Sequence, residues 1–163
     1  MSRLGTNGDA DMLFSWNDNL ETGIATIDRD HKAIIHLINE TAAVAASGRH
    51  PFAATERLQK LVGLFQRHFL KEQGVMAVAG YLGYAEHRNE HDEFLAAFQT
   101  MIEQSAGGRL RIDGSICYAL KFIIGHRSGA DAKLADFMEL RGPCVWPAGR
   151  PLPMAVRASS CRI

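Results

Sequence analysis

Several side chains that can bind a metal recur at helical spacing along the chain. His68 and Glu72 are four residues apart, and so are His87 and His91, so each pair would lie on one face of a helix. Taken alone, each pair fits a solvent-exposed pair equally well. A single inward-facing histidine is also typical of an ordinary core residue.

The complete set is harder to explain without a metal. Three further groups, His31, His126 and Asp131, fall on the inward faces of other amphipathic segments. Burying so many titratable groups without partners would cost several kcal/mol for each. Neutral imidazole and carboxylate are metal ligands in their preferred forms, and helical bundles hold such sites between facing helices. The seven groups exceed what one tetrahedral zinc ion takes, so they favour two octahedral ions that share bridging carboxylates.

One spacing does not fit a straight helix. His126 and Asp131 are five residues apart, which places them about 140° apart around a helix axis. Either the helix is distorted between them, with Gly129 accommodating a bulge, or the two groups reach different sides of a wide centre.

Four amphipathic segments must position these groups. The residues that separate the segments are Ser47-Gly48 and Pro51, then Gly80 and Gly83, then Gly107-Gly108. The first segment is expected to begin at Asp28, which suits an N-cap. Four helices of similar length with short connections predict an all-α, up-down-up-down four-helix bundle.

The two ends of the chain differ from these segments. Residues 1–11 are polar and predict a flexible N-terminus, whereas residues 12–26 carry apolar side chains without a helical period. We expect this second stretch to be an arm laid on the core, so that the bundle domain spans 12–141. Four of the five prolines lie beyond residue 142, which predicts an extended or disordered tail over 142–163.

The charge balance excludes several classes of function. The chain has 18 Lys and Arg against 18 Asp and Glu, which argues against a nucleic-acid binder and against a polybasic membrane binder. We expect no membrane insertion and no secretory signal, because no apolar run is long enough. The three cysteines form no paired motif, and Cys117 is expected in the core. These features predict a cytoplasmic protein.

Four motifs follow one another in a fixed order: a Trp16…Asp28…His31 stretch, HFLKE at 68–72, HRNEH at 87–91 and HRSGAD at 126–131. Over residues 12–139 this order resembles the bacterial hemerythrins, non-haem di-iron proteins that bind dioxygen. The resemblance implies two iron ions joined by an oxo or hydroxo bridge. The implied ligands are His87, His91 and His126 for one iron, His31 and His68 for the other, and Glu72 and Asp131 as bridges. The iron with two histidines would keep an open position for dioxygen.

The resemblance also implies a dry, apolar pocket around the bound gas. Its lining would be Ile34, Phe69, Phe122, Ile123 and Arg127. Phe122 replaces a usual tryptophan, and Arg127 replaces a usual aliphatic residue. Either the Arg127 stem packs and its guanidinium faces outward, or Arg127 brings a hydrogen-bond donor or a wetter opening to the pocket. In the second case we expect faster autoxidation than in a relative with an apolar pocket.

The leading hypothesis is reversible dioxygen binding, for carriage, storage or delivery, rather than enzymatic turnover. A nitrogen-rich ligand set with few carboxylates favours this function over that of the ferritin-like oxidases, which use Glu-x-x-His pairs. Three alternatives stay open. They are an oxygen or iron sensor with a separate, unknown protein partner, a di-iron peroxidase or scavenger, and a metal binder without oxygen chemistry, since these ligands accept several metals.

Overall fold

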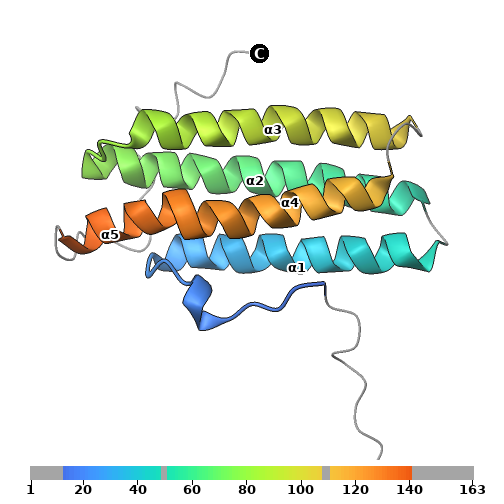
Figure 1. The fold of residues 1–163 in the computed structure, drawn as a ribbon, viewed down its shortest axis with the longest axis horizontal. Helices are drawn as coiled ribbons and strands as arrows, with labels where there is room; N and C mark the ends of the chain where they lie inside the picture. Colours follow the sequence, from blue (N-terminus) through green and yellow to red (C-terminus); the bar gives the residue numbers. More distant parts are fainter. Residues whose placement is uncertain (1–12, 49–50, 108–110, 141–163) are drawn as a thin grey trace, which may run out of the picture.

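The chain folds into long helices that lie side by side (Figure 1). The computed structural model describes residues 13–48, 51–107 and 111–140. The elements are η1 (Asp18–Leu20), α1 (Ala25–Ser47), α2 (Pro51–Ala79), α3 (Tyr84–Ala106), α4 (Ile112–His126), η2 (Arg127–Asp131) and α5 (Ala132–Leu140). Within these ranges there is no strand, and no helix is long and apolar enough to cross a membrane.

The predicted four-helix bundle is confirmed within the described residues. Each long helix packs against the next one along the chain, and α4 also packs against α1, which closes the bundle. Figure 1 shows α5 continuing the line of α4, so α4, η2 and α5 together make the fourth rod. The predicted tail over 142–163 and the predicted flexible residues 1–11 lie outside the described residues.

Apolar side chains form two clusters along the bundle. The larger contains the fully buried Phe65, Phe94 and Phe98, and the smaller contains Ile27, Met76 and Leu134. Burying one such phenylalanine contributes about 1.5–3 kcal/mol. Along α1, α2 and the fourth rod, the histidines and carboxylates identified from the sequence lie between residues of these two clusters. Apolar packing on both sides therefore isolates the polar layer from water.

The start of α1 differs from the expectation. The helix begins at Ala25, one turn before Asp28, so Asp28 is not its N-cap. Its carboxylate instead accepts hydrogen bonds from the amides of Thr22 (2.7 Å) and Gly23 (3.2 Å) and from the Thr22 hydroxyl (2.8 Å). Gly23 has a φ of +79°, a conformation that glycine adopts without strain. Asp28 thus fixes the turn that leads from the preceding segment into the helix.

Of the predicted arm over 12–26, residues 13–24 lie on the bundle as expected, and we call them the arm, whereas residues 25 and 26 already belong to α1. Phe14 and Trp16 pack against the larger apolar cluster. Phe14 also exchanges two hydrogen bonds with the Asn39 side chain of α1, at 3.1 and 2.8 Å. One expectation for the bundle is wrong, because Cys117 is exposed on α4 rather than buried in the core.

Candidate metal centre

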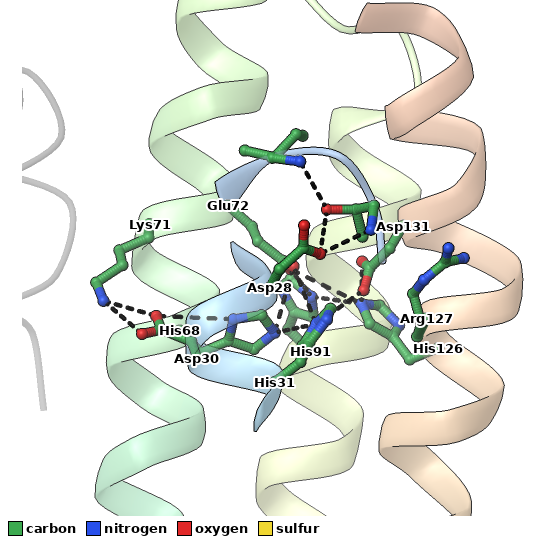
Figure 2. Close-up of polar contacts among 12 residues, drawn as sticks. Asp28, Asp30, His31, His68, Lys71, Glu72, His91, His126, Arg127 and Asp131 are labelled. Carbon is green, nitrogen blue, oxygen red and sulfur yellow. Dashed lines mark hydrogen bonds and ion pairs between the residues drawn. The ribbon is translucent and has the colours of Figure 1, made fainter. Parts of the chain in front are cut away.

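The seven predicted ligand residues converge in one buried layer. His31 comes from α1, His68 and Glu72 from α2, His87 and His91 from α3, His126 from the end of α4 and Asp131 from η2. None of the seven residues is more than 5% exposed. Figure 2 labels all of these residues except His87 and shows their side chains, which come from all four rods, directed toward one another.

A local distortion brings the fourth rod's two groups onto the same side. Residues Arg127–Asp131 form a π turn between α4 and α5. A π turn closes hydrogen bonds over five residues instead of four, so residues five apart come back toward one face. Of the two alternatives stated for this spacing, the structure has the distorted helix, with Gly129 inside the π turn, and His126 and Asp131 both face the centre.

Three histidines gather on one side of the layer, which we call the three-histidine side. The Nε2 atom of His126 lies 2.9 Å from that of His87 and 2.8 Å from that of His91. Oε2 of Glu72 lies 3.0 Å from His91 Nε2 and 3.4 Å from His87 Nε2. Glu72, His87, His91 and His126 together could hold one metal ion.

The other side, which we call the two-histidine side, is built from α1 and α2. The Nε2 atoms of His31 and His68 are 3.1 Å apart. Oε1 of Glu72 lies 3.3 Å from His68 Nε2, and Oδ2 of Asp131 lies 3.2 Å from His31 Nε2. These four residues form a second group that could hold a metal ion.

The two carboxylates link the two sides. Glu72 directs Oε1 toward His68 and Oε2 toward His91. Asp131 directs Oδ2 toward His31, and its Oδ1 lies 3.2 Å from both His87 and His126. Each carboxylate therefore presents one oxygen to each side, which is the arrangement that a bridging ligand needs.

Within the described chain, the atoms of this layer lack the partners that burial demands. No hydrogen bond reaches either carboxylate oxygen of Glu72 or of Asp131. Neighbouring imidazoles face one another through Nε2, and two neutral rings can share only one proton across such a contact. Cations among these atoms would satisfy the lone pairs that are otherwise unpaired. The residues present thus fit two metal ions.

Burial and the carboxylates move the histidine pKa values in opposite directions. Burial lowers the pKa of His68 to about 4. Burial also disfavours charged His126, but the adjacent carboxylates of Asp131 and Glu72 more than offset it and raise its pKa to about 10. Burial opposes ionisation of Glu72 and Asp131 as well, yet the surrounding histidines hold the pKa of both carboxyls below their usual range. In the absence of metal, positive charge therefore resides on the three-histidine side.

Sequence analysis missed the groups that contact the outer nitrogens of two of these histidines. Glu90 Oε2 accepts a hydrogen bond from His126 Nδ1 at 3.0 Å. On the other side, Lys71 donates to both oxygens of Asp30, at 2.8 and 2.6 Å, and Asp30 Oδ2 lies 4.0 Å from His68 Nδ1. A carboxylate behind a metal-binding imidazole fixes its tautomer and orientation. The acidic residue inside the HRNEH run was the available signal for Glu90.

Four of the five expected pocket residues lie in apolar surroundings of the layer. Phe69 stacks on the His91 ring at 3.7 Å between centroids, and Phe122 stacks on His126 at 4.9 Å. Ile34 and Ile123 are buried in the larger apolar cluster. These side chains exclude water from the centre on the side that faces that cluster.

Arg127, the fifth expected pocket residue, is oriented differently. Its Nε donates to the Leu20 carbonyl at 2.8 Å, and its Nη2 donates to the carbonyls of Glu21 and, at 3.4 Å, of Asn19. Figure 2 shows its guanidinium turned away from the histidines. Of the two alternatives stated for Arg127, the structure agrees with the outward-facing guanidinium, and it adds a partner for it.

Comparisons with known proteins point to one family. The family model described as the hemerythrin HHE cation binding domain matches residues 22–124, which leaves His126 and Asp131 beyond the matched range. The chain is 36% identical over 80 residues to a bacteriohemerythrin of Pseudomonas aeruginosa, covering 49% of this chain and 52% of that protein. It is 27% identical over 120 residues to the hemerythrin of Themiste dyscrita, covering 74% and 89%.

A longer match extends to another bacterium. The chain is 26% identical over 132 residues to a bacteriohemerythrin of Ralstonia nicotianae, covering 80% of this chain and 93% of that protein. The match to the Pseudomonas protein spans about half of that protein's length. Because the family model covers more than half of the chain, and because the site geometry agrees with it, this chain belongs to the hemerythrin family.

Proposed function

We propose that this protein binds dioxygen reversibly at a non-haem di-iron centre, for carriage, storage or delivery. The observation that carries the proposal is the uneven division of five buried histidines into groups of three and two, joined by two carboxylates with one oxygen on each side. The names of its relatives, hemerythrin and bacteriohemerythrin, agree with this proposal.

The roles of the residues follow from this division. His87, His91 and His126 would hold one iron, His31 and His68 the other, and Glu72 and Asp131 both. Ferrous iron would supply the electrons that dioxygen binding requires, and an oxo or hydroxo group would complete the bridge. The two-histidine side has fewer protein donors, so it is the side on which an exogenous ligand can be accommodated.

The protein's own groups would favour binding over turnover. Phe69, Ile34 and Ile123 surround the layer with apolar atoms, and a dry site protects a bound gas from protons. In the described chain no exposed acid or base contacts the two-histidine side directly, because Asp30 lies 4.0 Å from His68 and is paired with Lys71. Such a site offers little means of delivering protons to a substrate.

The test is the visible absorption of the iron-loaded protein through cycles of reduction, oxygen addition and oxygen removal. Charge-transfer bands that form with oxygen and vanish on its removal are expected over many cycles. One-way conversion to a ferric spectrum would contradict the proposal and favour a peroxidase or scavenger. A protein purified from cells with zinc and no colour would favour a metal binder without oxygen chemistry.

Helix α1 provides a matched pair of variants for the same experiment. His31→Ala removes a residue of the centre, whereas His36→Ala removes an exposed histidine that only faces Glu40 at 3.6 Å. The first variant is expected to lose the reversible bands and the second to keep them. Equal loss in both variants would contradict the assignment of the two-histidine side.

A further inference from the structure

The guanidinium of Arg127 joins the arm to the fourth rod. It donates to three successive backbone carbonyls, those of Asn19, Leu20 and Glu21, at the end of the η1 turn. Carbonyls at the end of a helical turn have no partner within the turn, and a cationic side chain satisfies them well. The interaction links residues more than 100 positions apart in the sequence. Arg127 therefore holds the arm against the fourth rod.

The middle of the arm has few other attachments. At one end Phe14 is bound to Asn39, and at the other the turn at Thr22 is bound to Asp28. Between these points the arm is attached by the packing of Trp16 against the larger apolar cluster, by Arg127, and by the exposed Lys32, which pairs with Glu21 at 2.9 Å and lies 5.2 Å from the centre of the Trp16 ring. Loss of the Arg127 hydrogen bonds would leave the η1 turn held mainly by this apolar packing and by Lys32.

A narrow crevice lies beneath this stretch and ends on the two-histidine side. Its walls include Trp16 and Leu20 of the arm, Ile35 of α1 and Ile123 of α4, and it reaches His31 and the Arg127 stem. The other six residues of the layer do not line it. The crevice is mostly apolar, which suits the passage of a small, weakly hydrated ligand. It is also closed in part by the same arm that Arg127 holds.

We propose that the arm is a movable cover over the route by which small ligands reach the His31–His68 iron, and that Arg127 controls how often it opens. The identity of the iron rests on the function proposed above. The movement does not, because it concerns the hydrogen bonds of the arm alone. A cover of this kind changes the rates of entering and leaving by the same factor, so it leaves the affinity of the centre unchanged. It also discriminates by size, since larger ligands need a wider opening.

Azide binding to the diferric protein, followed by stopped-flow absorption, tests the cover. Arg127→Leu keeps an apolar stem but removes all three hydrogen bonds. We expect both the association and the dissociation rate of azide to rise by at least about tenfold, because one hydrogen bond to a charged group corresponds to a factor of this size and the variant removes three. Thiocyanate, which is longer, should gain more than azide. The matched control is Arg88→Leu on α3, which removes an exposed arginine that pairs with Asp92 at 3.5 Å.

Hydrogen exchange of the arm amides provides a readout that does not depend on the metal. Residues 15–21 should exchange faster in Arg127→Leu than in the parent, and unchanged exchange would overturn the proposal. Faster exchange with unchanged azide rates would overturn it too, because the arm would then move without controlling access. Arg127→Lys keeps a cation but cannot span three carbonyls, so it should lie between the parent and Arg127→Leu in both measurements.

The autoxidation rate distinguishes an Arg127 that closes the arm from an Arg127 that places a hydrogen-bond donor inside the oxygen pocket. If Arg127 brought water to the oxygen site, its replacement should slow autoxidation. If Arg127 holds the arm closed, its replacement should speed autoxidation, because an open crevice admits water. Arg127→Ile is thus expected to autoxidise faster than the parent, and slower autoxidation would contradict the cover. A centre that binds azide but never releases oxygen intact would contradict the proposed function alone.

Discussion

The two sides of the centre have different surroundings, although the same two carboxylates join them. On the three-histidine side, His91 stacks on Phe69, and His126 stacks on Phe122 and is hydrogen-bonded by Glu90. On the two-histidine side, His31 faces a crevice under the arm. Rings held by stacking and by an outer carboxylate have little freedom, whereas under the proposed cover the narrow crevice admits a ligand when the arm moves. The comparison suggests that one side retains its metal and the other admits the ligand.

The largest expected effect comes from removing what the two sides share. Glu72→Ala deletes a group that places one oxygen on each side, and it leaves the Nε2 atoms of His68 and His91 without the carboxylate that faces them. We expect the loss of both iron ions, measured as iron per chain by atomic emission after loading and desalting. Glu56→Ala, which removes an exposed glutamate that pairs with Lys60 on the same helix, should keep the full amount. Retention of one ion in Glu72→Ala would show that a single side can hold metal alone.

The free energy of unfolding should depend more on the packing of the three-histidine side than on the arm that covers the two-histidine side. Phe69 is 2% exposed and stacks on His91, so Phe69→Ala should lower the free energy of unfolding by about 3–5 kcal/mol. Trp16→Ala removes a half-buried arm residue and should cost about 1–2 kcal/mol. Urea unfolding of the metal-free variants measures both. Equal losses would mean that the arm is as integral to the core as Phe69.

Much of the site follows from side-chain spacing alone. A repeat of three and four residues places His68 with Glu72 and His87 with His91, and it defines the helices that bring them together. The five-residue spacing of His126 and Asp131 was also informative, because a distorted helix was one of its two explanations and the π turn is such a distortion. Periodicity is a property of single helices, which is why these features were accessible.

Contacts between distant segments were not accessible in the same way. Arg127 stands beside a ligand, yet its partners are backbone carbonyls of residues 19–21, which carry no sequence signal. Asp28 resembled an N-cap, but tertiary hydrogen bonds with Thr22 and Gly23 use its carboxylate, and α1 begins a turn earlier. Cys117 was expected in the core because of its type, but its position on α4 faces outward.

The carboxylates near the Nδ1 atoms of His126 and His68 also differ between the two sides, and we expect a smaller effect from replacing them. Glu90 is hydrogen-bonded to His126 Nδ1 at 3.0 Å, whereas Asp30 is 4.0 Å from His68 Nδ1 and is paired with Lys71. Glu90→Gln should weaken metal binding about 10-fold to 100-fold. Asp30→Asn should weaken it less, because the distance exceeds that of a hydrogen bond. Competition with a coloured chelator measures both, and a larger effect from Asp30→Asn would reverse the proposed order.

The pH dependence of the stability of the metal-free protein probes both sides at once. His68 has a pKa near 4 in the fold against 6.5 when unfolded, so its contribution is complete above pH 6.5 and is lost as pH falls toward 4. His126 has a pKa near 10, so its contribution is complete below pH 6.5 and is lost as pH rises toward 10.

These two dependences have opposite signs, so the melting temperature in the presence of chelator should be highest near pH 6.5 and fall on either side. The acid loss is reinforced by Glu72 and Asp131, whose lowered pKa values also stabilise the fold only while the carboxyls are ionised. His126→Gln should flatten the alkaline side and His68→Gln the acid side. Metal binding requires neutral imidazoles, so loading should remove the alkaline decline. An alkaline decline that persists after loading would mean that a group outside the three-histidine side causes it.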